Sequence, residues 1–414
     1  MQSNPYLVWL LFCGAQGFLK SLVFTVTAVY FVEVIGLAPF QLVFIGTVME
    51  LTVFVFEVPT GAFADARGRK LSIIISTQLC GAGLVLVGAF PAYATVLIGY
   101  VVWGLGATFE SGALEAWITD EMRGRDLERV FVRGGQIGAA GSFFGILASV
   151  ALASVHLALP ILLGGLLGMA FGFVLLYVMP QREFSPAPSA TRSTWSELAY
   201  TARTGARLVR RTPLFVTVLG IAALFGMYTE STDRLWEAHL LETFGLPGLG
   251  NLDPVVWFGI IGCAGLLATV GASDLLARRL PAGGRGSMRL LAALDCILLA
   301  GALVFALAGD FYVAVLGYLI ATVARALDRP VFDAWLNSNI PSQQRATVLS
   351  IVQQSDAVGQ WTGGPAIGAV GSLFSLRAAL GAGALAMAPV VALYLRLLAR
   401  GEEKEVLEEA GVSG

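Results

Sequence analysis

Long apolar runs separated by short polar connections dominate the chain. A helix needs about 20 mainly apolar residues to cross a lipid bilayer, and twelve runs are long enough to do so. They are Pro5–Val34, Phe40–Ala62, Leu71–Pro91, Thr95–Ile118, Val132–Ser154, Leu157–Met179, Leu214–Trp236, Val255–Leu276, Met288–Ala308, Phe311–Trp335, Val348–Gly371 and Leu373–Leu398. The pattern predicts an all-α polytopic membrane protein with twelve transmembrane helices.

The connection between the sixth and seventh runs differs from the others. It begins with a Pro/Ser-rich stretch at Pro180, and from Trp195 apolar positions recur at helical spacing beside several arginines. We interpret this part as an amphipathic helix in the membrane interface, with a solvated linker as the alternative. The predicted domains are therefore a six-helix bundle (1–180), a cytoplasmic linker (181–212), a second six-helix bundle (213–400) and an acidic cytoplasmic tail (401–414).

The placement of positive charge predicts the orientation. Of the 26 Lys and Arg residues, all but five fall in connections on one side. Cytoplasmic connections carry such an excess, so we expect both termini to be cytoplasmic and the protein to span the cell's inner membrane several times. The five exceptions lie inside spans or at their far ends, namely Lys20, Arg234, Arg325, Arg329 and Arg377.

The two halves of the chain repeat each other. At a fixed offset of 218 residues, Glu110 matches Asp328, and the run Glu115-Ala116-Trp117 matches Asp333-Ala334-Trp335. A shorter match joins the connection after the second span to the connection after the eighth. Two six-helix halves of like orientation are typical of one class of secondary transporter.

The segment Gly61-Ala-Phe-Ala-Asp65-Ala-Arg-Gly68-Arg69-Lys70 resembles the signature that the major facilitator superfamily carries between its second and third helices. With twelve spans, a long middle linker and two similar halves, the resemblance covers essentially the whole chain. The lead-in Glu57-Val-Pro-Thr-Gly61 resembles bacterial drug-efflux members. The resemblance implies transport by alternating access between two bundles.

The signature also has a physical interpretation. Asp65 is an anion at a helix end and can accept hydrogen bonds from the N-terminus of a facing helix. Arg69 and Lys70 can pair with Asp120 or Glu121 at the end of the fourth span. The resemblance implies that such contacts form a latch that closes the cytoplasmic side. The alternative is that these charges only anchor the helix ends at the membrane surface.

The second half carries a degraded copy of the signature. It has Asp274, Arg278 and Arg279 but lacks the middle glycine, so we expect a weaker latch there. The predicted latch comprises Gly61, Asp65, Gly68, Arg69, Lys70, Asp120, Asp274 and Arg278.

Ionisable residues inside the predicted spans are the main candidates for transport chemistry. A charge at a helix centre costs about 2.5–3.5 kcal/mol on insertion scales, so such residues face the protein interior and mark function. The resemblance implies that the first, fourth, seventh and tenth spans line a central cavity, and these spans hold most of the charges. The candidates for substrate binding or proton coupling are Lys20, Glu50, Glu110, Glu115, Glu230, Asp233, Arg234, Arg325, Asp328, Arg329 and Asp333.

A structural role is the alternative for two pairs among these residues. Glu230 with Arg234, and Arg329 with Asp333, are spaced i,i+4 and can neutralise each other within one helix. Lys20 has no such neighbour, and we expect it to meet Glu50 or an acid of the fourth span.

Glu110 and Glu115 are the first candidates for proton coupling, because neither has an intrahelical base. On one continuous helix five residues correspond to about 140° of rotation. We therefore expect only one of the two carboxylates to face the cavity squarely.

The remaining residue types narrow the function further. The chain has two histidines and four isolated cysteines, with no Cys-x-x-Cys or His-x-x-x-His pair, so we expect no metal, no cofactor and no enzymatic activity. A formal net charge of -2 gives no basic field for nucleic acid.

We therefore expect a monomer whose partners are the lipid bilayer, protons and a small-molecule substrate. The favoured function is proton-coupled secondary transport that exports small amphipathic, drug-like compounds. One alternative is a transporter of the same fold for a lipid or an organic anion, in which Lys20 and the arginines of the tenth span would bind the anion. A second is a non-transporting membrane receptor or scaffold.

Overall fold

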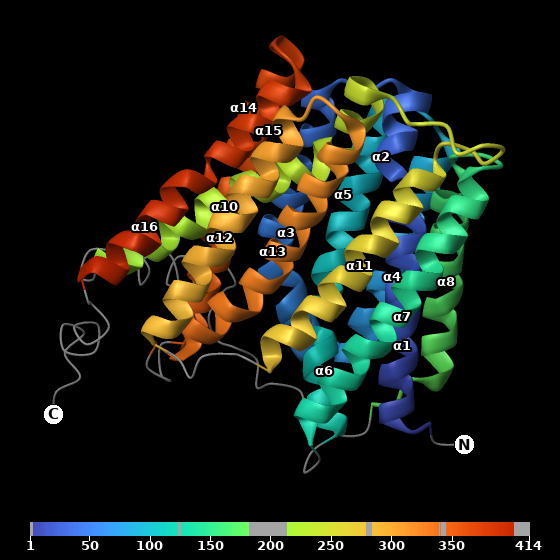
Figure 1. Ribbon diagram of the computed structural model, residues 1–414. Coiled ribbons are helices and arrows are strands. Elements are labelled where there is room, and N and C mark those ends of the chain that lie inside the picture. The colour runs from blue at the N-terminus through green and yellow to red at the C-terminus, as the bar shows by residue number, and fades with distance from the viewer. Residues whose placement is uncertain are drawn as a thin grey trace, which may run out of the picture. The chain divides into compact units, whose positions relative to one another are not determined.

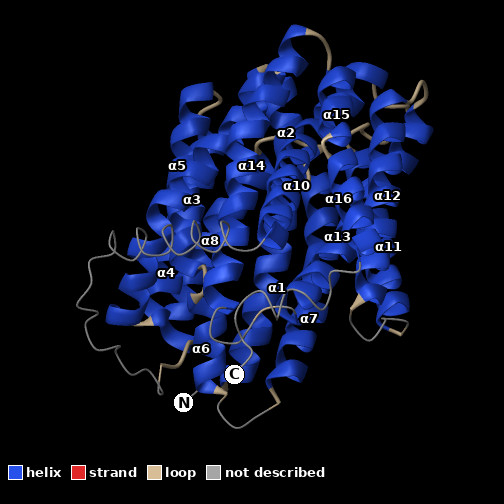
Figure 2. Ribbon diagram, turned by 90° about the vertical axis from the view of Figure 1, so that its left-hand side faces the viewer, coloured by secondary structure: helices blue, strands red, loops and turns tan. Residues whose placement is uncertain are grey.

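The computed structural model describes residues 3–122, 126–181, 213–278, 284–338, 340 and 345–400. The predicted interfacial helix after Trp195 and the acidic tail lie outside these residues. Within them, eleven helical segments are long and apolar enough to cross a membrane, and Figure 2 shows helices joined by short loops. The all-α, multi-pass fold is thereby confirmed.

The helices of the first half follow the predicted runs closely (Figure 1). They are α1 (Pro5–Phe24), α2 (Thr27–Tyr30), the π-helical turn η1 (Phe31–Ile35), α3 (Pro39–Arg67), α4 (Arg69–Ala89), α5 (Tyr93–Glu110), α6 (Ala113–Glu121), α7 (Leu127–Ala153) and α8 (Leu159–Val178). Local chemistry sets their ends. Asn4 caps α1, its side-chain oxygen accepting from the Tyr6 amide at 3.0 Å, and Gly68, at φ 110°, separates α3 from α4.

The second half begins at α10. Its helices are α10 (Pro213–His239), the π-helical turn η2 (Leu240–Phe244), α11 (Val256–Ala277), α12 (Arg285–Leu307), α13 (Phe311–Ser338), α14 (Arg345–Leu373), α15 (Leu376–Leu385) and α16 (Met387–Arg400). At 29 residues α14 is long enough to be the one remaining span, the eleventh of the twelve along the chain. It is more polar than the other spans, since it carries Gln353, Gln354, Asp356 and Gln360.

The chain folds into two compact units. The first unit contains α1, α2, α4–α8, most of α3 and the start of α11 up to Cys263. The second contains residues 38–47, which include the start of α3, together with α10, the rest of α11 and α12–α16. Each unit is described below by itself.

Glycine contacts show that the sequence repeat is also a repeat of packing. A Cβ on Gly83 of α4 would meet the Gly99 carbonyl oxygen of α5, and a Cβ on Gly301 of α12 would meet that of Gly317 of α13 in the same way. Gly301 follows Gly83 by 218 residues, and Gly317 follows Gly99 by the same number. Close helix crossings of this kind are typical of membrane bundles, where small residues let the backbones approach.

A second glycine crossing repeats with a different offset. A Cβ on Gly17 of α1 would meet the backbone of Gly138 on α7, and one on Gly226 of α10 would meet the backbone of Asp356 on α14. The α7 residue is shifted by 218 residues, whereas the α1 residue is shifted by 209 (Gly17 to Gly226). Corresponding positions in the two units can therefore be assigned helix by helix.

Candidate functional site

A break in the fourth span organises the polar centre of the first unit. Helix α5 ends at Glu110, α6 begins at Ala113, and between them Gly112 adopts a left-handed conformation at φ 69°. Glu110, before the break, and Glu115, after it, both line one cavity. The expectation that only one of them would face the cavity squarely assumed a continuous helix, whereas the helix breaks between them.

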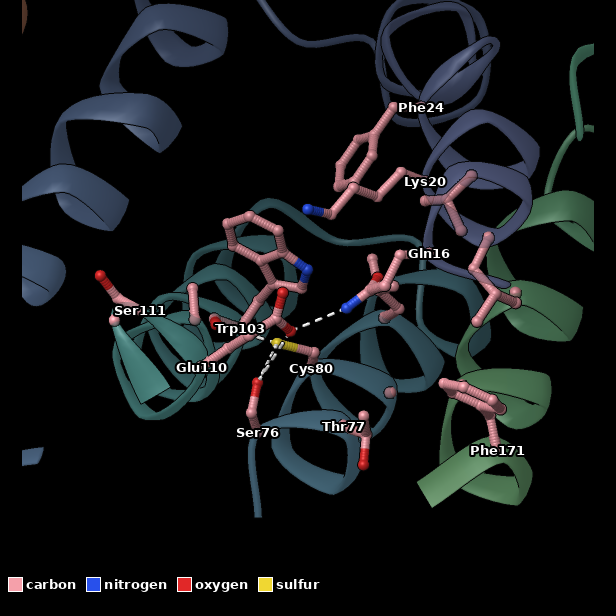
Figure 3. A pocket seen from close by; sticks show the side chains of 18 of the residues that line it. Gln16, Lys20, Phe24, Ser76, Thr77, Cys80, Trp103, Glu110, Ser111 and Phe171 are labelled. Atoms are coloured by element: carbon pink, nitrogen blue, oxygen red, sulfur yellow. Dashed lines mark hydrogen bonds between the residues drawn. The ribbon is translucent and has the colours of Figure 1, made fainter. Parts of the chain in front are cut away.

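The cavity has a volume of about 290 Å³ and is lined by residues of α1, α4, α5, α6 and α8 (Figure 3). Aromatic side chains supply part of its wall, and the rings of Phe24 and Trp103 meet edge to face at 5.8 Å between centroids. Its polar and ionisable lining comprises Gln16, Lys20, Ser76, Thr77, Cys80, Glu110, Ser111 and Glu115.

Two neutral side chains hold the Glu110 carboxylate. Gln16 of α1 donates from Nε2 to Glu110 Oε2 at 2.7 Å, and Ser76 of α4 donates from Oγ to the same oxygen at 3.5 Å. The Ser76 hydroxyl also lies 3.9 Å from the Cys80 sulfur. Glu110 is therefore fixed from two helices through one of its oxygens.

Lys20 lies on the same cavity as Glu110 and Glu115, and Figure 3 shows its ammonium group pointing into the space beside Trp103. No ion pair joins Lys20 to another described residue at salt-bridge distance. Of its two expected neighbours, the acids of the fourth span share the cavity, whereas Glu50, half-buried on α3, does not line it.

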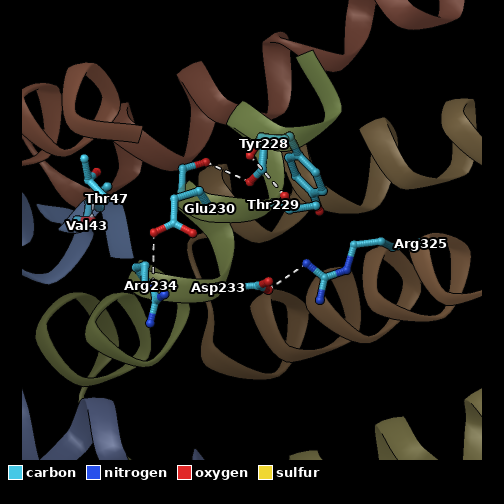
Figure 4. Close-up of polar contacts among 10 residues, drawn as sticks. Val43, Thr47, Tyr228, Thr229, Glu230, Asp233, Arg234 and Arg325 are labelled. Carbon is cyan, nitrogen blue, oxygen red and sulfur yellow. Dashed lines mark hydrogen bonds and ion pairs between the residues drawn. The ribbon is translucent and has the colours of Figure 1, made fainter. Parts of the chain in front are cut away.

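Charges in the second unit are arranged differently, since most are engaged with one another. Arg325 on α13 donates to Asp233 on α10 at 2.6 Å, and Arg234 donates to Glu230, one turn earlier on α10, at 3.1 Å (Figure 4). The intrahelical pair predicted for Glu230 is thus present. The contact between Asp233 and Arg325 joins two helices, and sequence spacing alone gave no signal for it.

The remaining candidates lie further along α13. Arg329 contacts Asp333 at 3.6 Å, the other intrahelical pair predicted, and also approaches Asp356 of α14 at 3.9 Å. Asp328, the neighbour of Arg329 in the chain, is only 5% exposed. It lines a separate cavity of about 20 Å³.

Comparison with known proteins identifies the fold. Residues 8–299, more than half of the chain, match the family described as Major Facilitator Superfamily. The chain belongs to this superfamily. It is therefore a membrane transporter and not an enzyme, as expected from the sequence.

Relatives of this superfamily member differ in what they transport. The chain is 30% identical over 128 residues to "Uncharacterized MFS-type transporter YxaM" of Bacillus subtilis (strain 168), and the match spans 31% of that protein's length and 30% of this chain. A mutant of the nucleoside transporter NupG is similar in structure, with TM-score 0.79 and 14% identity over 95% of this chain and all of that one.

A peptide transporter POT in complex with sulfate gives a TM-score of 0.73 at 15% identity, covering 96% of this chain and 95% of that one. At this level of identity the structural likenesses show the fold alone. A particular resemblance to drug-efflux members of the superfamily is not confirmed.

The superfamily signature forms an ion pair at the end of α4. Arg69 pairs with Asp120 of α6, and its Nη1 also donates to the Ala116 carbonyl oxygen at 2.7 Å. Gly68 needs its positive φ, and an added Cβ there would press on the Gln181 side chain. All of these residues lie in the first unit, so the pair fixes α4 to α6.

The other residues of the predicted latch make fewer contacts. Asp65 is exposed, and the predicted hydrogen bonds to a facing helix N-terminus are not among the contacts of the described residues. Gly61 has open space where a Cβ would lie, and Lys70 is half-buried. In the second unit Arg278 donates to Asp274 at 2.6 Å within the same helix end, with both side chains exposed.

Several residues of the site were missed by reasoning from charge and spacing. Ser76 and Cys80 are neutral and have no distinguishing signal in the sequence. Glu57 of α3 was not among the site candidates, yet its Oε1 accepts a hydrogen bond of 2.6 Å from Ser111, at the break between α5 and α6.

Proposed function

We propose that this transporter is a proton-coupled secondary transporter that exports small amphipathic compounds by alternating access. The observation that carries the proposal is the shared cavity of the first unit. Glu110, Glu115 and Lys20 line it together with aromatic rings. Ionisable residues at membrane depth are costly, and they are retained where they bind a substrate or an ion.

Proton coupling needs a carboxylate that can gain and lose a proton while the site keeps its shape. Both hydrogen bonds recorded for Glu110 come to Oε2. A carboxylic acid still accepts through the oxygen that lacks the proton. A proton on Oε1 would therefore leave the donors from Gln16 and Ser76 in place, and Glu110 could titrate without losing its position.

The lining of the cavity favours an organic substrate with a positive charge. Its volume of about 290 Å³ is close to the lower end of the usual range for ligand pockets, which suits a small molecule. The rings of Phe24, Trp103 and Phe171 offer apolar and stacking surfaces. Two carboxylates face one ammonium group, so a cationic or zwitterionic compound suits the cavity better than an anion.

The alternative of a lipid or organic-anion transporter is less well supported. It assigned anion binding to Lys20 and to the arginines of the tenth span. Arg325 is bound to Asp233, and Arg329 lies between Asp333 and Asp356. The positive charges of these arginines are therefore already paired with acids. In the large cavity, Lys20 is the cation that an anionic substrate could bind.

Proton flux into proteoliposomes tests this proposal. Cationic, neutral and anionic amphiphiles are added in turn to vesicles containing the purified protein, and internal pH is followed. We expect cationic compounds to drive proton movement in the wild type and Glu110→Gln to abolish it. Glu128→Gln, at an exposed acid near the start of α7 in the same unit, is the matched control. Flux driven only by anions would favour the alternative substrate class.

A further inference from the structure

A small cavity in the second unit holds polar groups that the proposed transport cavity does not use. It has a volume of about 20 Å³, enough for about one water-sized ligand. Four helices contribute ionisable side chains to it, and α10 contributes only apolar ones. The ionisable lining consists of Asp295 from α12, Asp328 and Arg329 from α13, Asp356 from α14 and Tyr394 from α16.

Three of these side chains are buried with an unused polar atom. Asp295, Asp328 and Tyr394 are 1%, 5% and 1% exposed. Asp295 Oδ1, Asp328 Oδ1 and the Tyr394 hydroxyl have no hydrogen-bond partner among the described residues. Buried polar atoms are nearly always satisfied. The Tyr394 hydroxyl can donate to only one of the two carboxylate oxygens, so the cavity is short of at least one donor.

The neighbouring charges do not supply that donor. Arg329 contacts Asp333 at 3.6 Å and Asp356 at 3.9 Å. Asp356 also accepts a hydrogen bond of 2.8 Å from Gln360. The side chains that complete the lining are apolar, namely Ile221, Ala222, Phe225, Phe332 and Val352. Arg329 thus lies on the cavity, but among the described residues no cation forms an ion pair with Asp295 or Asp328 at salt-bridge distance.

The corresponding place in the first unit shows what has changed. Asp328 corresponds to Glu110, which receives hydrogen bonds from Gln16 and Ser76. With the offsets given by the glycine crossings, Gln16 corresponds to Phe225 and Ser76 to Leu294. Both donors have thus been replaced by apolar residues.

A second replacement adds an acid at the same place. Thr77, the neighbour of Ser76, corresponds to Asp295. The second unit has therefore exchanged a carboxylate that receives two hydrogen bonds for two carboxylates that each have an unsatisfied oxygen. Two carboxylates that share a site cannot both stay ionised at low cost, and a single proton between them relieves the repulsion.

We propose that Asp295 and Asp328 form a proton-binding site in which one proton is shared between the two carboxylates and the Tyr394 hydroxyl donates to one of them. Proton uptake forms one O–H bond on a carboxylate oxygen and breaks no other bond in the protein. The resulting acid is the donor that the cavity lacks, because a protonated carboxyl donates as well as accepts. If the proposed proton-coupled transport is correct, this site is a second place at which the protein can carry a proton.

A bound metal ion is the competing occupant and is less favoured. Among the described residues, no group of three or more His, Cys, Asp or Glu is placed to hold a metal ion. The pair offers two carboxylates and one hydroxyl, whereas hard cations prefer about six or more oxygen ligands. A proton needs only one.

Infrared spectroscopy of the purified full-length protein tests this site without any substrate. The C=O stretch of a protonated carboxylic acid is separate from the carboxylate bands and shifts in D₂O. We expect the neutral-pH spectrum of the wild type to contain such a band that is lost in both Asp295→Asn and Asp328→Asn. Asp310→Asn is the matched control, since Asp310 is an exposed residue capping α13 and Asn can replace it as a cap. It should keep the band.

Several results would overturn the proposal. Identical acid bands in the wild type and both Asn variants would show that neither carboxylate holds a proton. Loss of the wild-type band on addition of NaCl, but not of an equal concentration of choline chloride, would show that a sodium ion occupies the site instead. If the Asn variants do not fold, Tyr394→Phe serves: removal of its hydroxyl should shift the acid band, and an unshifted band contradicts the proposal. Because no transport is measured, a negative result leaves the transport proposal for the Glu110 cavity standing.

Discussion

The two units place a carboxylate at equivalent positions and surround it in opposite ways. Glu110 lies at a helix break, holds hydrogen bonds from two neutral donors and lines a cavity of about 290 Å³. Asp328 lies on the unbroken helix α13, has an unused buried oxygen and lines a cavity of about 20 Å³. The backbone crossings are shared, so the difference lies in a few side chains.

The break itself explains part of the contrast. Ser111-Gly112 in the first half corresponds to Arg329-Pro330 in the second. Gly112 leaves the helical conformation at φ 69°, whereas Pro330 stays within α13. A proline can remain in a helix with a bend, but a residue in the left-handed region ends it. The cavity at this point is therefore large in the first half, about 290 Å³, and small in the second, about 20 Å³.

Substitutions at the glycine crossings should cause the largest loss of folded protein. We expect this loss to be equal in the two units. We expect Gly17→Val and Gly226→Val each to abolish accumulation of folded protein, since the added side chain would overlap the facing backbone. Size-exclusion chromatography of a fluorescent fusion measures this. Gly135→Val and Gly220→Val, at positions with nothing within 4 Å of an added Cβ, are the controls for the two units. If only one of the two variants folded normally, the two glycine crossings would not be equivalent in the two units.

The ion pairs of the two signature copies should give the next largest effect, because they should contribute differently to stability. Arg69→Gln removes a partly buried pair with Asp120 and a bond to the Ala116 carbonyl, so we expect a loss of about 1–3 kcal/mol in stability. Arg278→Gln breaks an exposed pair within one helix end and should cost less than about 1 kcal/mol. Thermal unfolding of both variants in the same detergent measures the difference. Equal losses would show that the two copies contribute alike.

The helix break should have a moderate effect on stability and a separate effect on transport. We expect Gly112→Ala to cost about 1–2 kcal/mol, because an alanine in the left-handed region is strained, and to reduce transport by turning Glu115 away from Glu110. Gly61→Ala lies within α3 with space around it and should be neutral or stabilising by about 1 kcal/mol. Thermal unfolding and transport are compared for the pair. If the Gly112→Ala protein were destabilised but transported normally, the break between α5 and α6 would not be needed for transport.

Much of the fold could be predicted from the sequence, and the reason is physical. Apolar runs of sufficient length leave few options in lipid, so the spans followed from composition alone. The candidate acids Glu110 and Glu115 also stood out, because charges inside such runs are rare. The break between them was hidden, since Ser111 and Gly112 do not interrupt an apolar run that reads as one helix.

Contacts between helices were the part that the sequence left open. Asp295 and Tyr394 are far apart in the chain, and only packing brings both to the cavity of Asp328. The pair Asp233 and Arg325 was invisible for the same reason. The predicted interfacial helix after Trp195 lies outside the described residues and stays a prediction, as do the cytoplasmic termini.

The central claim is that substrate and proton use the same carboxylates in the first unit. The most direct measurement is the equilibrium affinity of the purified protein for a cationic amphiphile identified by the proton-flux screen, determined across pH. Glu110 attracts a cation only after it has lost its proton, so affinity should rise with pH in the wild type. We predict that it becomes independent of pH in a Glu110→Gln/Glu115→Gln double variant, with Glu128→Gln behaving as the wild type. A double variant that retains the full pH dependence would contradict the account.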